Sequence, residues 1–573
     1  MTLLSAKTSV ANAVRIAAAK GIKYAVISPG SRNAPLTISL DEHPNITCLN
    51  IPDERVAGFF ALGMAQELQS PVILCCTSGS AALNYAPAIV EAYYQKIPLL
   101  IYTADRPTEW IDQRAGQTMR QHEVYANYIK SSYQLLSEAK QRDHLWYNDR
   151  IINQAVDETM IDGPGPVHVN FPMREPLYDL IKLEELSPPK VVTSIQRKNV
   201  LPESAIDELK EAWSRHDSVL VIIGQRARSE RFDRAIEALS TLSHVIILTE
   251  NTSNVCATKV YRSIDRLIDS IGPEEYSAFT PSLVISCAGP IVSKKIRFML
   301  RDMNIAEHWH VDPVDQYVDT YRALTQNVPL MIQELVPIVS QVDHRVDQRF
   351  MANWKRREAD TKSAHDVYVD QVEWCDLQVM NAIHERVPGG QFHIASSTPV
   401  RYTQLFETRM DLQYRANRGV SGIDGCTSTA AGAAYVCDEV VTLVTGDIAF
   451  FYDSNAFWHH HVGDNLRVIM INNEGGNIFR YVKGPQRTSQ FEKHFEAHHV
   501  TTAKGIAEAY HVNYLTAMDA ESLEDQLDII YNHDYVGPVI LEIFTPRELN
   551  IQILKDYFAY IKSKVRPADA ESD

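Results

Sequence analysis

The sequence has few cysteines, and no two of them have CxxC spacing. Eight cysteines are scattered over 573 residues, so neither a disulfide framework nor a thiolate zinc site of the usual spacing is indicated. Cys75 and Cys76 lie inside an apolar run that is typical of a buried strand. Buried thiols favour a reducing compartment, so we expect a cytoplasmic protein without disulfides.

Long apolar runs and an excess of basic residues are also missing. No uninterrupted apolar stretch approaches the roughly 18 residues of a membrane-spanning helix, and residues 1–21 have the pattern of an amphipathic helix rather than of a signal peptide. Asp and Glu outnumber Lys and Arg by 72 to 55, which gives a formal net charge of -17. Because phosphate binding requires clustered Lys and Arg, we expect no nucleic-acid partner and no integral membrane segment.

What the sequence does contain is a repeated alternation of strand-like and helix-like segments. Apolar runs that end in turn residues recur along the chain, as in PVILCCTSG, VLVIIGQ and VVTLVTG. A polar linker precedes the second group of runs, and the charged stretch near 353–366 marks either a boundary or a solvated helix. We therefore predict three doubly wound α/β domains with parallel sheets, at residues 1–182, 195–345 and 355–560, and a flexible tail at 561–573.

Two runs in the third predicted domain end in polar residues. Gly446 and Asp447 close the run VVTLVTG, and Asn472 and Asn473 close the run LRVIMINN. The segment between them is long enough for a crossover helix, so Asp447 and Asn473 should lie at the carboxyl ends of adjacent parallel strands. Oxygen-bearing side chains and glycine backbone suit a hard cation such as Mg²⁺ that holds phosphates. The alternative is that these are ordinary turn residues, which are common at strand ends.

This pattern resembles the thiamine diphosphate signature, in which a Gly-Asp pair is followed by a double Asn. The resemblance implies thiamine diphosphate as cofactor, with Mg²⁺ or Mn²⁺ bound by the side-chain oxygens of Asp447 and Asn473 and the carbonyl oxygen of Gly475. Gly446 is then a further cofactor-binding residue.

The run His459, His460 and His461 suggests a zinc site at first sight. Consecutive residues on a helix point in different directions and do not easily share one ion. We therefore do not predict zinc here.

Glu54 in the first domain suits thiamine chemistry. The cofactor needs a carboxylate that hydrogen-bonds its aminopyrimidine ring, so that the imino tautomer of the ring can remove the thiazolium proton. Glu54 precedes a small-residue-rich helical segment, VAGFFALGMA. The alternative is that Glu54 only caps this helix, where the dipole stabilises a carboxylate by about 0.3 to 1 kcal/mol. The diphosphate motif downstream favours the catalytic role.

Several further segments resemble one family closely. They are SPGSRNAPL, DERVAGFFALG, TSGSAALNYAPAIVEA, TADRP and GPVHVNFPMREPL in the first domain, and ANRGVSGIDGCTSTAAGAA, TGDIAFFYDSNAF and INNEGGNIF in the third. These segments look like those of the 2-succinyl-5-enolpyruvyl-6-hydroxy-3-cyclohexene-1-carboxylate synthase family of menaquinone biosynthesis. The middle domain carries much less that is diagnostic. The resemblance implies pyrimidine-binding, central and pyrophosphate-binding domains, in that order.

The family resemblance also implies a reaction and an assembly. In the family reaction, 2-oxoglutarate is decarboxylated and the resulting succinyl carbanion adds to isochorismate. The cofactor then lies between the first domain of one subunit and the third domain of another, in a homodimer or homotetramer. Two alternatives stay open: another thiamine-dependent decarboxylase or carboligase, such as a relative of acetohydroxyacid synthase, and a catalytically silent binding homologue.

Both substrates are dianions, and guanidinium groups bind carboxylates through paired hydrogen bonds. By resemblance, Ser397, Arg401 and Arg418 hold the succinyl carboxylate. The residues that face isochorismate by resemblance are Arg32, Arg106, Gln117 and Lys295, of which Arg32, Arg106 and Gln117 join Glu54 as predicted catalytic residues. Ser31 is a further predicted substrate-binding residue. Lys294 stays open as an alternative to Lys295. For any one arginine, a surface ion pair is the alternative interpretation.

Three apolar residues complete the predicted site. By resemblance, Ile423 lies beneath the cofactor and forces it into a bent shape. Ile478 and Phe479 would form an apolar wall that keeps water from the reacting carbon. The alternative for all three is an ordinary place in the core.

Overall fold

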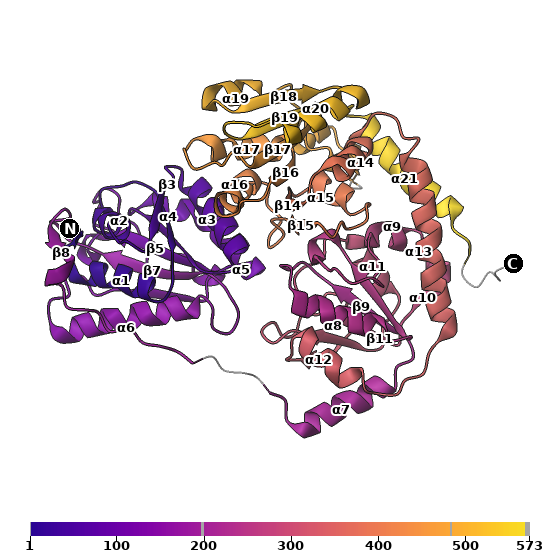
Figure 1. Cartoon of the computed structure of the whole chain (residues 1–573), viewed down its shortest axis with the longest axis horizontal. Coiled ribbons are helices and arrows are strands. Elements are labelled where there is room, and N and C mark those ends of the chain that lie inside the picture. The colour runs from indigo at the N-terminus through magenta and orange to yellow at the C-terminus, as the bar shows by residue number, and fades with distance from the viewer. Residues whose placement is uncertain (1, 196–199, 482–483, 568–573) are drawn as a thin grey trace.

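The structure, a computed structural model, describes residues 2–195, 200–481 and 484–567. Its helices and strands form three parallel-sheet α/β units that follow one another along the chain (Figure 1). The first unit lies at the left of the view, the second at the lower right and the third at the top. The fold class predicted from the sequence is confirmed.

Six parallel strands form the sheet of the first unit. In pairing order they are β3 (Thr47–Asn50), β2 (Tyr24–Ile27), β4 (Val72–Cys76), β5 (Leu99–Asp105), β7 (Val167–Pro172) and β6 (Ser131–Gln134). The helices are α1 (Thr8–Ala19), α2 (Ala34–Asp41), α3 (Glu54–Leu68), α4 (Ser80–Asn84), α5 (Ala86–Gln95) and α6 (Arg142–Glu158). A short antiparallel pair, β1 (Leu3–Ser5) and β8 (Leu180–Lys182), joins the two ends of the unit. Every residue of β4 is buried, which explains its unbroken apolar sequence.

The central unit has five parallel strands. In pairing order they are β10 (Val245–Thr249), β9 (Val219–Ile223), β11 (Leu283–Cys287), β12 (His308–Val311) and β13 (Leu324–Val328). Its helices are α7 (Glu203–Ser214), α8 (Glu230–Ser240), α9 (Ile264–Asp269), α10 (Tyr276–Phe279), α11 (Lys294–Asp302) and α12 (Ile332–Val339). The long helix α13 (Gln348–Val369) then leads to the third unit.

The third unit again has six parallel strands. In pairing order they are β15 (Leu412–Arg415), β14 (Gly390–Ile394), β16 (Val441–Gly446), β17 (Leu466–Asn472), β19 (Val539–Phe544) and β18 (Asn513–Ala517). Its helices are α14 (Asp376–Arg386), α15 (Thr398–Thr403), α16 (Cys426–Val436), α17 (Asp447–Tyr452), α18 (Ile478–Tyr481), α19 (Lys504–Tyr510), α20 (Ala520–Asn532) and α21 (Leu549–Lys564).

The three sheets share the order of their first four strands. With the parallel strands of each unit numbered along the chain, the order is 2-1-3-4-6-5 in the first and third sheets and 2-1-3-4-5 in the central sheet. In such a sheet the winding direction reverses between strands 1 and 3, and ligands bind outside the carboxyl ends of these strands. The favoured positions are therefore the ends of β2 and β4 in the first unit and of β14 and β16 in the third.

The first and third units touch through α3 and α16. A Cβ on Gly63 of α3 would collide with the carbonyl oxygen of Thr429, and a Cβ on Gly432 of α16 would collide with that of Phe60. One continuous apolar core joins the two units. The small-residue-rich sequence after Glu54 therefore allows two helix backbones to meet directly.

The charged stretch near 353–366 is part of α13, which packs against α21 (Figure 1). It is not a fully solvated helix, since Phe350 and Trp354 on α13 are buried. The tail predicted from residue 561 also needs correction: α21 continues to Lys564, Ile561 is buried, and Arg566 forms an ion pair with Asp360 (2.9 Å). Residues 568–573 of that predicted tail lie outside the described residues.

Within the described ranges, no helix combines the length and the apolar character that crossing a membrane requires. All eight cysteines belong to the described residues and have free thiols. Cys75 and Cys76 are fully buried in β4, and burial raises the pKa of Cys75 to about 12, so this thiol stays protonated at neutral pH.

Candidate active site

Asp447 and Asn473 follow the ends of two paired strands, as the sequence predicts. β16 and β17 are parallel, with Gly446 opposite Ile471, so both strands end at the same edge of the sheet. Asp447 is the first residue of α17, and Asn473 comes directly after β17. Their exposed fractions are 2% and 4%. Because buried polar groups require partners, the contacts of these two side chains define the site.

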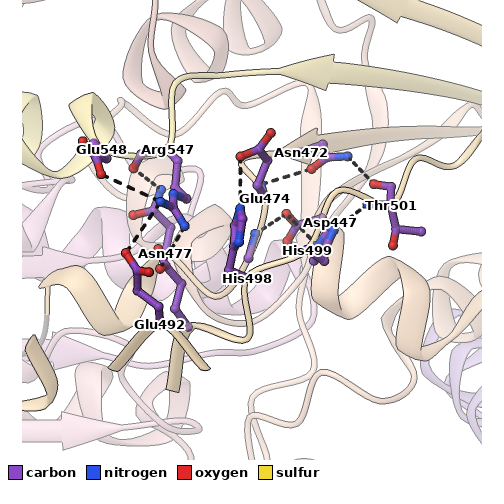
Figure 2. A network of polar contacts seen from close by, with 12 residues as sticks. Asp447, Asn472, Glu474, Asn477, Glu492, His498, His499, Thr501, Arg547 and Glu548 are labelled. Carbon is purple, nitrogen blue, oxygen red and sulfur yellow. Dashed lines mark hydrogen bonds and ion pairs between the residues drawn. The ribbon is translucent and has the colours of Figure 1, made fainter. Parts of the chain in front are cut away.

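Asp447 has donors around its carboxylate. Its Oδ2 accepts a hydrogen bond from the backbone N–H of Gly475 (2.8 Å) and lies 3.4 Å from Nε2 of His499. The nearby carboxylate of Asp447 raises the pKa of His499. Figure 2 shows Asp447 and His499 pointing toward one another, with Glu474 and His498 beside them. The position in front of Asp447 therefore favours a positive charge.

The side-chain amide of Asn473 is held by a hydrogen bond to a buried carboxylate. Its Nδ2 donates to Oδ2 of Asp376, the first residue of α14 (3.0 Å). Asp376 is almost completely buried, and burial raises its pKa to about 6. Because an amide that donates through its NH₂ group presents its oxygen on the other side, Asn473 Oδ1 faces away from Asp376.

The side-chain oxygens of Asp447 and Asn473 and the carbonyl oxygen of Gly475 fit a hard divalent cation. Carboxylate, amide and carbonyl oxygens are the ligands that Mg²⁺ and Mn²⁺ prefer. Gly475 has a φ of +148°, and a Cβ there would lie 2.8 Å from the carbonyl oxygen of Glu496, so only glycine suits this position. A Cβ on Gly446 would meet nothing within 4 Å, so the space beside it is open to a ligand. The residues described contain no group of three or more His, Cys, Asp or Glu that could hold a metal, so an ion here depends on the mixed donor set and on ligand oxygens.

Glu54 opens α3, but it does not cap the helix. Asp53 is the cap: its Oδ1 accepts hydrogen bonds from the N–H groups of Arg55 (3.0 Å) and Val56 (3.3 Å), and its Oδ2 accepts one from Asn455 of the third unit (2.8 Å). In the described parts of the chain, the Glu54 carboxylate makes no hydrogen bond or ion pair with another residue. Burial raises the pKa of Glu54. Asp53 is therefore the N-cap residue, and the half-buried carboxylate of Glu54, in the first turn of α3, is free to meet a ligand.

The predicted apolar residues are only partly buried. Ile423 packs against the core that the first and third units share. Ile478 and Phe479 begin α18, directly after the Asn473 loop; this helix has no buried residue, and Phe479 is 37% exposed. The ring of Phe479 faces that of Phe495, with 6.2 Å between centroids. Ile478 and Phe479 are therefore not core residues, and they stay candidates for an apolar wall.

Ser31 and Arg32 follow β2, at the favoured edge of the first sheet. The buried guanidinium of Arg32 donates to the carbonyl oxygen of Met173 (3.1 Å) and forms an ion pair with Glu175 (3.0 Å). Since Glu175 is largely exposed, a substrate carboxylate can replace it without burying an unpaired charge.

Gln117 and Arg106 lie on the same side of this sheet. Gln117 has a φ of +55° and packs against Gly79, which follows the end of β4. Arg106 follows β5, and its buried Nε has no hydrogen-bond partner among the residues described. The structure therefore brings these residues to one edge of the sheet, and their roles stay predictions.

Arg401, Arg418 and Lys294 form a cluster of positive charges between the third and central units. Arg401 is on α15, Arg418 follows β15, and Lys294 opens α11. Repulsion from Arg401 is the largest cause that lowers the pKa of Lys294, and it also lowers the pKa of Arg418 in addition to burial. Across the described residues, none of the three forms an ion pair within 4.0 Å. Arg401 and Arg418 are partly buried, and partly buried cations without paired anions cost free energy, so the cluster favours an anionic ligand.

Ser397 and two residues that the sequence did not predict adjoin this cluster. Ser397 precedes α15 with a φ of +85°, a strained backbone conformation. Arg418 donates to the hydroxyl of Ser396 (3.4 Å). Glu250, fully buried, attracts Arg418 and accepts hydrogen bonds from two backbone N–H groups just before α11; burial raises its pKa to about 7. Glu250 is thus the acid that balances part of the cluster's charge.

Lys295 lies elsewhere, which corrects the sequence prediction. Its Nζ is 2.8 Å from Asp269 Oδ1 and 3.1 Å from the centroid of the Phe558 ring. Adjacent residues on a helix point about 100° apart, so only one of the two lysines can face Arg401. Arg401 repels Lys294, so Lys294, the alternative that the sequence left open, becomes the prediction for this position.

We expect Lys294→Ala and Lys295→Ala to separate binding from stability. Lys294→Ala removes a cation that Arg401 repels, so the KM for an anionic substrate should rise about 10-fold without loss of thermal stability. Lys295→Ala removes an ion pair and a cation–π contact, so its thermal midpoint should fall while KM stays unchanged. Steady-state kinetics and thermal melts check both; a higher KM for Lys295→Ala alone would restore the original assignment.

Several residues at the site carry no local sequence signal. Asp376 lies 97 positions from Asn473, and an acidic residue at a helix start is ordinary. Glu91 on α5 accepts hydrogen bonds from the N–H of Gly419 (2.6 Å) and from the next residue, and so holds the loop that carries Arg418. Only the tertiary fold brings these groups together.

The three consecutive histidines lie in a turn, so the argument from helix directions does not apply to them. The ring of His459 packs edge-on against Phe60 (5.2 Å between centroids), and Nε2 of His461 accepts a hydrogen bond from the N–H of Asn50 (3.2 Å). Burial lowers the pKa of His459 to about 4. These contacts make His459 and His461 part of the packing between the first and third units.

Known proteins resemble this chain along nearly its full length. Residues 9–124 match the family model described as "Thiamine pyrophosphate enzyme, N-terminal TPP binding domain". A protein of Christiangramia forsetii named 2-succinyl-5-enolpyruvyl-6-hydroxy-3-cyclohexene-1-carboxylate synthase is 39% identical over 569 residues, which cover 96% of this chain and 98% of the relative. Proteins with the same name from Flavobacterium johnsoniae and Porphyromonas gingivalis are 38% and 35% identical, over 95% and 96% of this chain and 97% and 96% of the relatives.

Proposed function

The chain belongs to the 2-succinyl-5-enolpyruvyl-6-hydroxy-3-cyclohexene-1-carboxylate synthase family of thiamine pyrophosphate (diphosphate) enzymes, and on this premise we propose how its residues perform the family reaction. The chain is a thiamine diphosphate-dependent transferase of menaquinone biosynthesis. It decarboxylates 2-oxoglutarate and joins the resulting succinyl unit to isochorismate by 1,4-addition. The alternatives of an acetohydroxyacid synthase relative and of a silent homologue do not explain both the full-length similarity and the cationic cluster.

The third unit holds the diphosphate end of the cofactor. Asp447, Asn473 and Gly475 would bind Mg²⁺ or Mn²⁺, which neutralises the diphosphate charge, and the open space beside Gly446 admits the phosphates. Bound thiamine diphosphate supplies the electron sink that lets a 2-oxo acid lose carbon dioxide. Glu54 would hold a proton at the aminopyrimidine ring, because its carboxyl group has no competing partner among the described residues and its pKa is raised.

The observation that carries the substrate assignment is the unpaired cluster of Arg401, Arg418 and Lys294. Several cations within reach of one another bind a dianion more tightly than a monoanion, since each carboxylate can take its own partner. This favours 2-oxoglutarate over pyruvate. Arg32, Arg106 and Gln117 at the edge of the first sheet would bind the carboxylates of isochorismate, while Ile478 and Phe479 would keep water from the reacting carbon. Ser31 and Ser397 would also bind substrate, and Ile423 would lie beneath the cofactor.

The active unit would be a homodimer, or a homotetramer built from two dimers. The Glu54 carboxylate, at the start of α3, has no partner in the described parts of its own chain, which supports a site completed by a second chain. The eight free thiols support a cytoplasmic location.

Carbon dioxide release from different 2-oxo acids tests this proposal. With thiamine diphosphate and Mg²⁺ present, kcat/KM for 2-oxoglutarate should exceed that for pyruvate by about 10- to 150-fold, because one charged hydrogen bond contributes about 1.5 to 3 kcal/mol. Equal use of both acids would assign the chain to a different specificity within the thiamine enzymes.

A further inference from the structure

We propose that Asp376 is a positioning residue that fixes the orientation of the Asn473 amide, so that the oxygen and not the NH₂ group of Asn473 faces the metal. This inference rests on the proposed function, in which Asn473 is a metal ligand. It follows from a hydrogen-bond network of four buried side chains, which are Asn550, Thr545, Asp376 and Asn473. Their exposed fractions are 1%, 8%, 1% and 4%.

The hydrogen-bond network begins at a group that can only donate. The backbone N–H of Asp376 donates to the side-chain oxygen Oδ1 of Asn550 (2.8 Å). A backbone N–H can only donate, so the Asn550 amide must present its oxygen here and its NH₂ group on the opposite side.

The hydroxyl of Thr545 transmits this direction of hydrogen bonding from Asn550 to Asp376. Nδ2 of Asn550 donates to the hydroxyl oxygen of Thr545 (3.2 Å). The hydroxyl therefore accepts from Asn550, and its single hydrogen is free to donate to Oδ1 of Asp376 (2.6 Å).

Asp376 determines which side of the Asn473 amide faces it. An ionised carboxylate only accepts hydrogen bonds, and its second oxygen, Oδ2, lies 3.0 Å from Asn473 Nδ2. Asn473 must therefore turn its NH₂ group toward Asp376 and its oxygen toward the site. Since all four side chains are buried, water does not compete for these bonds.

The same hydrogen-bond network predicts what happens when the Asp376 carboxylate is replaced by an amide. In Asp376→Asn the Thr545 hydroxyl still donates toward the first position, so the new amide places its oxygen there. Its NH₂ group then faces Asn473, which must rotate to accept a hydrogen bond. The rotated Asn473 presents its own NH₂ group to the metal, and an NH₂ group does not ligate Mg²⁺ or Mn²⁺.

Metal affinity is the direct test. Mn²⁺ binding to the full-length protein in the presence of thiamine diphosphate, followed by electron paramagnetic resonance, should weaken about 10- to 100-fold in Asp376→Asn, which is the usual effect of removing a partner of a metal ligand. Thr545→Val is the matched control. It breaks the same network but leaves Asp376 as an acceptor, so Mn²⁺ affinity should stay within a few-fold of wild type even though the thermal midpoint falls.

A double variant provides rescue. In Asp376→Asn with Asn473→Asp, the new amide donates to the new carboxylate, whose other oxygen faces the metal. Mn²⁺ affinity should return to within about 10-fold of wild type. Equal loss in Thr545→Val and Asp376→Asn, or no rescue in the folded double variant, would overturn the inference and leave only a structural role for Asp376. If wild-type protein itself binds no Mn²⁺ with thiamine diphosphate, the proposed metal site fails instead, so the two failures are distinguishable.

Discussion

Glu54→Gln should lower kcat by about 1000-fold while the Kd for thiamine diphosphate changes only a few-fold. Acid–base groups contribute about 10²- to 10⁴-fold to catalysis, and glutamine has the shape of glutamate without a carboxylate to hold the proton. The structure adds that Asp53, not Glu54, caps α3. The substitution should therefore leave the helix and its contact with α16 intact. Single-turnover kinetics and cofactor titration measure the two quantities.

Asp53→Asn is the matched control, because it alters the neighbouring carboxylate that caps the helix and contacts Asn455. Asn caps a helix about as well as Asp, so the substitution mainly loses the hydrogen bond from Asn455; it should lower the thermal midpoint slightly and leave kcat within about 10-fold of wild type. Near-normal turnover in Glu54→Gln would show that another group manages the proton.

A mixing experiment places Glu54 relative to the metal site. Glu54→Gln and Asp447→Ala are each expected to be inactive. If the site combines Glu54 of one subunit with Asp447 of the other, random exchange at equal amounts makes half of the dimers mixed, and each mixed dimer has one intact site. About one quarter of wild-type activity should then return. A site within one chain predicts no recovery.

Arg418→Ala should raise the KM for 2-oxoglutarate about 10- to 150-fold, since a hydrogen bond to a charged group contributes about 1.5 to 3 kcal/mol. Arg418 is mostly buried beside Arg401, and no carboxylate forms an ion pair with it in the described residues. Its guanidinium is therefore available to the substrate. In thermal melts, 2-oxoglutarate should raise the midpoint of wild-type protein more than that of the variant, because ligand binding stabilises the folded state by mass action.

Arg215→Ala, directly after α7, is the control for a general loss of positive charge. Arg215 is exposed and lies 3.9 Å from Glu211, one helical turn away. Pairs of this kind contribute little, so its KM should match wild type. An Arg418→Ala enzyme with the wild-type dependence on 2-oxoglutarate would remove Arg418 from the substrate site.

The strands that the sequence revealed are mostly interior strands. β4, β9 and β17 are buried along their whole length and appear as unbroken apolar runs. The strands without such a signal are β3, β6, β13 and β18, and each of them forms the edge of its sheet. These four strands are partly exposed, so polar residues interrupt their pattern, whereas the edge strand β10 is fully buried and mostly apolar. The sequence therefore identified the sheets but not their full width.

The same distinction holds for the site. Asp447 and Asn473 could be placed from sequence because parallel strands end at a common edge, which is a local rule. The choice between Lys294 and Lys295 depends on how α11 is rotated against α15, and no pattern within either segment encodes that rotation. Glu91 and Asp376 act on residues far away along the chain, so only the packed structure reveals them.

The most direct test is to identify the product by mass spectrometry after incubating the purified full-length protein with thiamine diphosphate, Mg²⁺, 2-oxoglutarate and isochorismate. Our account predicts carbon dioxide and an adduct with the combined mass of the two substrates less carbon dioxide. The adduct should form in the complete mixture only, and no incubation that lacks one component should contain it. Carbon dioxide from pyruvate without any adduct from 2-oxoglutarate and isochorismate would contradict the account.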